Sequence, residues 1–140
     1  MAQQTSTRTT LNIVSVIRAA LIASSIATVI NIMIFFIALS QFRGVTAFGQ
    51  PLNFLSIIGA SFGLIIIGCG IMIGLDIFLD NTIKGWRNLS IIALLISVAF
   101  PYLFLQNATL GAIIALEAMQ LVAGVIGIYM LTTQVTIDRG

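Results

Sequence analysis

The sequence predicts an all-α integral membrane protein: an antiparallel four-helix bundle with both termini in the cytoplasm. Of its 140 residues, 59% are hydrophobic and only 7% are charged, and the mean hydropathy is +1.16. Soluble domains are about 25% charged and about 45–50% apolar. A soluble fold of this size buries only about two-thirds of its surface, so it would leave much apolar surface in water. Lipid is the solvent that suits this composition.

Four apolar segments are long enough to cross about 30 Å of hydrocarbon, which takes about 20 helical residues. We predict helices over residues 19–40, 54–78, 89–105 and 110–132. They form a single transmembrane domain at 11–133, between a polar N-terminal tail (1–10) and a C-terminal tail (134–140). The connection after the third helix is so short that the third and fourth helices must be antiparallel neighbours. The first apolar stretch exceeds the about 7–15 residues of a signal-peptide core, so we expect the chain to retain it.

Basic residues near the helix ends predict the orientation. With four spans, both termini share a membrane side with the connection between the second and third helices. The basic residues on that side are Arg8, Arg18, Lys84, Arg87 and Arg139. On the opposite side the sequence has only Arg43. Cytoplasmic loops carry the excess of Lys and Arg, so both termini are expected in the cytoplasm.

The sequence offers little material for catalysis. It has no histidine, which removes the commonest metal ligand and general base. It has one cysteine, Cys69, and we find neither a nucleophile–base set nor a phosphate-binding loop. We therefore expect no enzyme, no metal and no cofactor. A nucleic-acid partner is not expected either, because the basic residues do not cluster.

Three polar residues are predicted to form a cluster near the middle of the membrane: Asn31, Glu117 and Gln120. Polar groups in lipid are costly and therefore face protein or a cavity. One interpretation is a site that handles protons or ions, since a carboxylate in a low-dielectric environment can exchange a proton near neutral pH. The alternative is a structural hydrogen-bond cluster that holds the first and fourth helices together, at about 0.6–2 kcal/mol per bond.

Two further features lie near the ends of the helices. Arg18 and Asp76 are predicted at matching depths near the inner interface, as an ion pair. Such a pair would serve either as a gate or lipid-headgroup site, or as a structural pair between snorkelling side chains. Pro101 is predicted to kink or break the third helix, because it frees the carbonyl of Ser97, which Gln120 or water would then satisfy.

A stripe of glycines runs along the second helix at Gly59, Gly63, Gly70 and Gly74, in two GxxxG patterns. Glycine lets two helices approach closely, and close packing replaces the hydrophobic drive that is missing in lipid. The stripe predicts an interface with another copy or another protein, or else tight packing within the same bundle.

Several of these motifs together resemble a family of small bacterial four-helix membrane proteins, a domain of unknown function numbered 6069. The resemblance covers about residues 12 to 133. It rests on Arg18, Asn31, the glycine-rich second helix, the segment Ala99-Phe100-Pro101, and the run from Ala118 to Gly124. Members of that family often carry a histidine where this chain has Gln120, so a histidine-based role does not transfer. The resemblance implies a bacterial cytoplasmic membrane and no specific activity.

The predicted function is that of an accessory or scaffolding multi-pass membrane subunit. It would be surrounded by membrane lipids and would pack through the glycine stripe as a homo-oligomer or within a larger membrane complex. The alternative is a small oligomeric transporter or channel that uses Asn31, Glu117 and Gln120. In that case pairing of copies would be required, because four helices enclose little space. A bound magnesium tetrapyrrole is a third option, for which the spacing of these residues gives no specific support.

Overall fold

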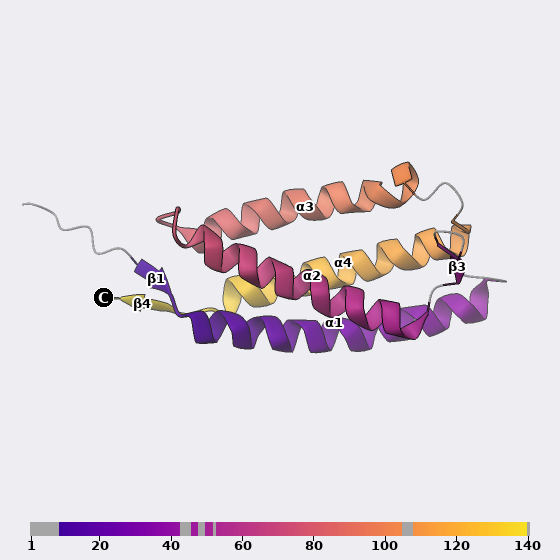
Figure 1. Ribbon diagram of the computed structural model, residues 1–140, viewed down its shortest axis with the longest axis horizontal. Helices are drawn as coiled ribbons and strands as arrows, with labels where there is room; N and C mark the ends of the chain where they lie inside the picture. Colours follow the sequence, from indigo (N-terminus) through magenta and orange to yellow (C-terminus); the bar gives the residue numbers. More distant parts are fainter. Residues whose placement is uncertain (1–8, 43–45, 48–49, 52, 105–107, 140) are drawn as a thin grey trace, which may run out of the picture.

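A computed structural model describes residues 9–42, 46–47, 50–51, 53–104 and 108–139. Four long helices lie side by side along one axis (Figure 1). They are α1 (Ile13–Gln41), α2 (Phe54–Leu75), α3 (Thr82–Phe104) and α4 (Leu110–Thr133). All four are long and apolar enough to cross a membrane. The predicted all-α fold of four antiparallel apolar helices is therefore confirmed.

Two short antiparallel ribbons accompany the helices. Strand β1 (Thr9–Leu11) pairs with β4 (Ile137–Arg139), and β2 (Thr46–Ala47) pairs with β3 (Gln50–Pro51). The first ribbon ties the N-terminal and C-terminal segments together at one end of the bundle (Figure 1). The Asn12 N–H continues the pairing by donating to the carbonyl of Thr136 at 3.0 Å.

Side-chain caps set the starts of the helices, and two of them lie earlier than the hydropathy pattern predicted. Asn12 accepts a hydrogen bond from the backbone of Ser15 at 3.0 Å, so α1 begins at Ile13 rather than near residue 19. Asn81 accepts from the backbone of Lys84 at 3.1 Å, so α3 begins at Thr82 rather than near residue 89. Asparagine is among the best N-cap residues because its side chain satisfies an orphan N–H of the first turn. The polar first turns lower the local hydropathy without ending the helix.

The end of α2 also differs from the prediction. The helix ends at Leu75 rather than near residue 78, and a turn leads into α3. Asp76 fixes this turn by accepting hydrogen bonds from the Thr82 hydroxyl at 2.7 Å and from the backbone of Leu11 at 3.1 Å. The second bond joins the turn to β1.

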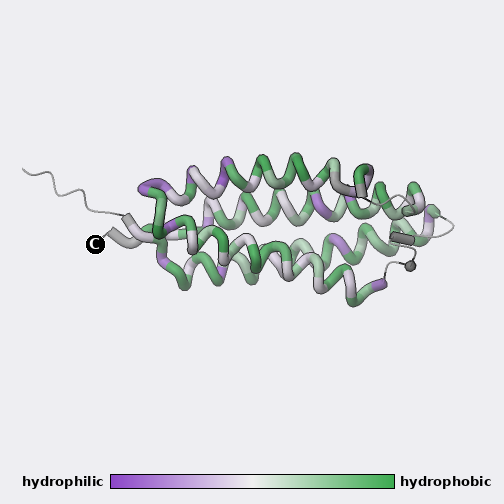
Figure 2. Tube along the Cα trace, turned by 45° about the horizontal axis from the view of Figure 1, so that its top comes forward, coloured by the Kyte–Doolittle hydropathy of each residue, from purple (hydrophilic) through white to green (hydrophobic). Residues whose placement is uncertain are grey.

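Helix α1 is the centre of the packing: it lies against both α4 and α2, whereas α3 packs mainly against α4. Its buried face is built from small residues, Ala19, Ala20, Ala23 and Ala27. Small residues let helices approach closely in a membrane. Figure 2 shows that the helices are mostly hydrophobic along their length, with isolated hydrophilic positions inside them.

Candidate functional site: a polar layer inside the bundle

The buried core is divided into two apolar clusters. The cluster near the termini includes Ala27 of α1, Ile65 of α2 and Ala123 of α4. The other includes Phe35 of α1, Ile57 of α2 and Met119 of α4. On each of these three helices, polar residues occupy the interval between the clusters: Thr28 and Asn31 on α1, Ser61 on α2 and Gln120 on α4. A polar layer therefore crosses the bundle near its middle.

Asn31 joins α1 to α2. Its Nδ2 donates to the Ser61 Oγ at 2.8 Å, and the two residues are only 2% and 3% exposed. The sequence interpretation placed the partners of Asn31 on the fourth helix and overlooked Ser61. The only sequence signal for Ser61 was its position inside the first GxxxG pattern. That pattern was interpreted through its glycines, and Ser61 was not considered as a hydrogen-bond partner.

Glu117 and Gln120 lie toward α3. A Cβ added at Gly124, one turn further along α4, would meet the Leu94 Cδ1 of α3 at 2.5 Å. The Tyr102 hydroxyl of α3 approaches the Glu117 carboxylate. Among the described residues no hydrogen bond joins Asn31 to Glu117 or Gln120. The contacts of the three predicted residues are therefore divided: Asn31 bonds Ser61 of α2, whereas Glu117 and Gln120 lie toward α3. Glu117 lies outside the polar layer, beside the apolar cluster that contains Ala115 and Met119.

Several oxygens of this region are buried without a hydrogen-bond partner. They are Thr28 Oγ1, Asn31 Oδ1, Glu117 Oε1 and Gln120 Oε1. A buried acceptor without a donor costs about 1–3 kcal/mol, and buried polar atoms in folded proteins are rarely left in this state. Chemically, these oxygens can be satisfied by water, by a cation or by a proton on Glu117. Among the described residues, no group of three or more acidic, cysteine or histidine side chains could hold a metal ion.

The predicted ion pair between Arg18 and Asp76 is not formed among the described residues. Asp76 instead bonds Thr82 and Leu11. Arg18 is exposed and lines a different cavity, between α1 and α4. The sequence positions predicted how far along the bundle axis each residue lies. They did not predict the rotation of each helix, which directs the two side chains into different clefts.

The glycine stripe of α2 faces away from the rest of the chain. A Cβ added at Gly59, Gly63, Gly70 or Gly74 would meet nothing within 4 Å. Packing within the bundle, one of the two interpretations from sequence, therefore does not explain the stripe. The glycine of α2 that does pack inside is Gly68, where an added Cβ would lie 2.9 Å from Cη2 of Trp86. Sequence analysis missed this contact, although Trp86 is the only tryptophan in the chain.

Pro101 lies inside α3 and is buried. The helix continues through it to Phe104, so α3 is not broken at Pro101, and the predicted kink stays a prediction. Within the described part of the chain, Gln120 does not donate to the freed carbonyl of Ser97.

The sequence of this chain matches a known protein family. Residues 5–136 match the sequence pattern of a family of unknown function, DUF6069. The chain belongs to the DUF6069 family. This confirms the resemblance drawn from Arg18, Asn31 and the segments around Pro101 and Gln120. Neither the curated proteins nor the solved structures contain a match to the chain. Membership in DUF6069 assigns no activity, so the function must be argued from the structure itself.

Proposed function

We propose that this DUF6069 chain is an accessory or scaffolding multi-pass subunit of a bacterial cytoplasmic membrane. It packs through the glycine stripe of α2 against a second copy of itself or within a larger membrane complex. The observation that carries the proposal is the open space over all four glycines of the stripe.

The four glycines destabilise α2 unless another helix packs against them. Each glycine inside a helix costs roughly 0.5–1 kcal/mol relative to alanine. A close helix neighbour recovers this cost, because small residues let the two backbones pack tightly. Among the described residues no neighbour does so at these four positions. A partner outside the chain provides the missing contact.

The surface around the stripe has the shape of a helix-packing groove. At about 100° per residue, Ile66 and Ile67 project on either side of the glycines, and they are 42% and 62% exposed. Branched side chains beside a row of glycines form ridges along a shallow groove. A ridge from a partner helix fits into such a groove.

The charge distribution supports the membrane orientation. Both termini lie at one end of the bundle, where β1 pairs with β4. Arg18, Lys84 and Arg87 lie toward that end, at the starts of α1 and α3. The predicted contributions of Arg8 and Arg43 fall outside the described residues. Excess basic residues mark the cytoplasmic side, so the termini are proposed to be cytoplasmic.

The test is native mass spectrometry after gentle extraction from the membrane, with Gly63→Leu and Gly70→Leu compared with Ala93→Leu. Ala93 is an exposed small residue on α3, so its substitution is a matched control on another face. We expect the assembly to disperse with either glycine variant and to persist with the control. An assembly that survives both glycine substitutions, or a wild-type chain that is extracted alone, would contradict the proposal.

A second candidate function, a small oligomeric transporter or channel, is favoured by the unpaired oxygens in and beside the polar layer. Four buried acceptors without donors suit the passage or storage of a proton or cation. In proteoliposomes, Glu117→Gln should then abolish a pH-dependent flux while the assembly stays intact. A variant with unchanged flux, or a wild-type protein with no flux, would exclude this function.

A further inference from the structure

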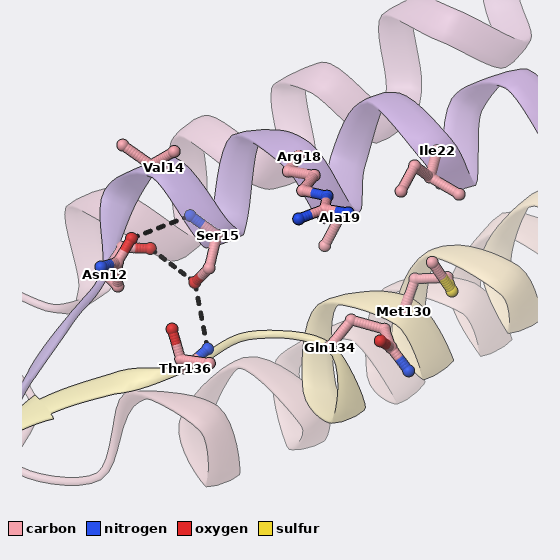
Figure 3. A pocket seen from close by; sticks show the side chains of 9 residues that line it. All are labelled: Asn12, Val14, Ser15, Arg18, Ala19, Ile22, Met130, Gln134 and Thr136. Atoms are coloured by element: carbon pink, nitrogen blue, oxygen red, sulfur yellow. Dashed lines mark hydrogen bonds between the residues drawn. The ribbon is translucent and has the colours of Figure 1, made fainter.

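A cavity of about 390 Å³ lies between α1 and α4, at the end of the bundle that carries both termini (Figure 3). It is separate from the polar layer and from the glycine stripe. Its walls come from the first turns of α1, from the last turn of α4 and from the segment that leads to β4. Its volume is in the range typical of small-ligand sites, about 300–1,000 Å³.

The walls of this cavity change from polar to apolar with depth. At the outer end lie Val14 and the polar side chains of Asn12, Ser15 and Thr136, and Arg18 of α1 and Gln134 at the end of α4 lie further in (Figure 3). Ala19 lies next to Arg18, and Ile22 and Met130 lie about one helical turn deeper than Arg18 and Gln134 on the two antiparallel helices. The cavity thus offers a hydrogen-bonding entrance above an apolar floor, which matches a molecule with a polar head and a hydrocarbon chain.

The entrance carries one positive charge, on Arg18. Arg18 is exposed, and within the described residues no acidic side chain forms an ion pair with it. Asp76 and Asp80 line a different cavity, and Asp138 belongs to β4, two residues beyond Thr136. No hydrogen bond of the described residues uses the side-chain amide of Gln134. A guanidinium with free donors matches the paired oxygens of a phosphate.

The depth of Arg18 matches a lipid headgroup. Helix α1 has 29 residues, or about 44 Å at 1.5 Å per residue, which exceeds about 30 Å of hydrocarbon. About 7 Å then extends beyond the hydrocarbon at each end. Arg18 lies five residues after Ile13, or about 7.5 Å along the axis. Its side chain therefore starts at the boundary between acyl chains and headgroups.

We propose that this cavity binds an anionic phospholipid, with the phosphate on Arg18 and Gln134 and the start of an acyl chain between Ile22 and Met130. The inference rests on the membrane location given under the proposed function and is independent of the glycine stripe. The apolar floor distinguishes a lipid from a water-soluble phosphate ester, which would leave Ile22 and Met130 unoccupied.

The experiment compares retention of dioleoyl-phosphatidylglycerol and dioleoyl-phosphatidylcholine by the purified full chain, using native mass spectrometry. The variants are Arg18→Gln, which removes the charge, and Gln134→Glu, which places a carboxylate at the exposed C-cap of α4 with the same side-chain shape. The control is Arg87→Gln, which removes an exposed charge at the same end of the bundle but outside the cavity. Far-UV circular dichroism checks that each variant remains helical.

We expect the wild-type chain and Arg87→Gln to retain phosphatidylglycerol in preference to phosphatidylcholine. Arg18→Gln should weaken that retention by about tenfold or more, as expected for a charge-assisted hydrogen bond, and Gln134→Glu should weaken it as well. Should Arg18→Gln be misfolded, Gln134→Glu carries the test alone, because it keeps Arg18 and the helix cap.

Three results would overturn the inference. The first is equal retention by the wild-type chain and by a folded Arg18→Gln or Gln134→Glu variant. The second is an equal loss in Arg87→Gln, which would indicate a general charge effect. The third is Arg18-dependent binding of glycerol 3-phosphate as tight as that of phosphatidylglycerol, which would assign the site to a soluble phosphate ester. A glycine-stripe variant that loses assembly but keeps the lipid would separate this site from the proposed interface.

Discussion

Replacing Gly68 with alanine tests how α2 and α3 are held together. An added Cβ at Gly68 would lie 2.9 Å from Cη2 of Trp86, whereas carbon atoms in good contact are about 3.5–4.0 Å apart. The indole is 7% exposed and is confined by its surroundings, so it must shift by several tenths of an ångström. Overpacking of this kind costs about 1–3 kcal/mol.

Gly127→Ala on α4 is the control outside the glycine stripe, because an added Cβ there would lie 3.7 Å from Cγ1 of Ile65, an ordinary contact. Both substitutions gain the same roughly 0.5–1 kcal/mol of helix propensity, so this gain cancels in the comparison. We expect Gly68→Ala to lower the free energy of unfolding by about 1–3 kcal/mol relative to Gly127→Ala.

The assay is reversible unfolding in mixed micelles, followed by circular dichroism and by tryptophan fluorescence. Trp86 is the only tryptophan, so its emission reports directly on the contact. A shift of the native emission in Gly68→Ala, but not in Gly127→Ala, is the expected spectroscopic result. Equal stabilities with unchanged emission would refute the packing of Trp86 against α2.

Three further predictions concern other contacts. A double-mutant cycle with Asn31→Leu and Ser61→Ala should give a coupling energy of about 0.6–1.7 kcal/mol, as found for hydrogen bonds between membrane helices; additive effects would mean that the 2.8 Å bond contributes nothing. Asp76→Ala should lower the unfolding free energy by about 1–3 kcal/mol, because the Thr82 hydroxyl loses its acceptor. It should also speed hydrogen exchange in β1, because the Leu11 N–H loses its bond to Asp76. Unchanged exchange in β1 would argue against this bond. Cys69 is buried, so a water-soluble maleimide should label it fully only after unfolding, and rapid labelling of the native protein would contradict its burial.

The sequence alone was sufficient for the number of helices and for their antiparallel order. The hydropathy of a segment is an average over its own residues, so it can be obtained without the tertiary structure. The thickness of the hydrocarbon layer sets the length that each apolar segment needs. The starts of α1 and α3 were less certain because Asn12 and Asn81 begin these helices in polar turns, ahead of the apolar segments. A cap is a local hydrogen bond that an average over many residues does not register.

The helix neighbours could not be obtained from the sequence in the same way. In a soluble bundle the apolar stripe marks the buried face of each helix. In a chain whose helices are apolar on all sides, the lipid-facing and protein-facing surfaces share the same composition. The spacing of the polar residues therefore predicted common faces without predicting what each face would contact.

The tertiary structure decided those contacts. It paired Asn31 with Ser61 of α2 and placed Glu117 near Tyr102 of α3. It also turned one glycine of α2 inward to meet Trp86 and left the four glycines of the stripe open. The sequence by itself determined that four apolar helices lie antiparallel, because segment length and hydropathy are properties of each helix. The rotation of each helix about its axis depends on all its neighbours at once, and only their packing together fixed which side chains meet.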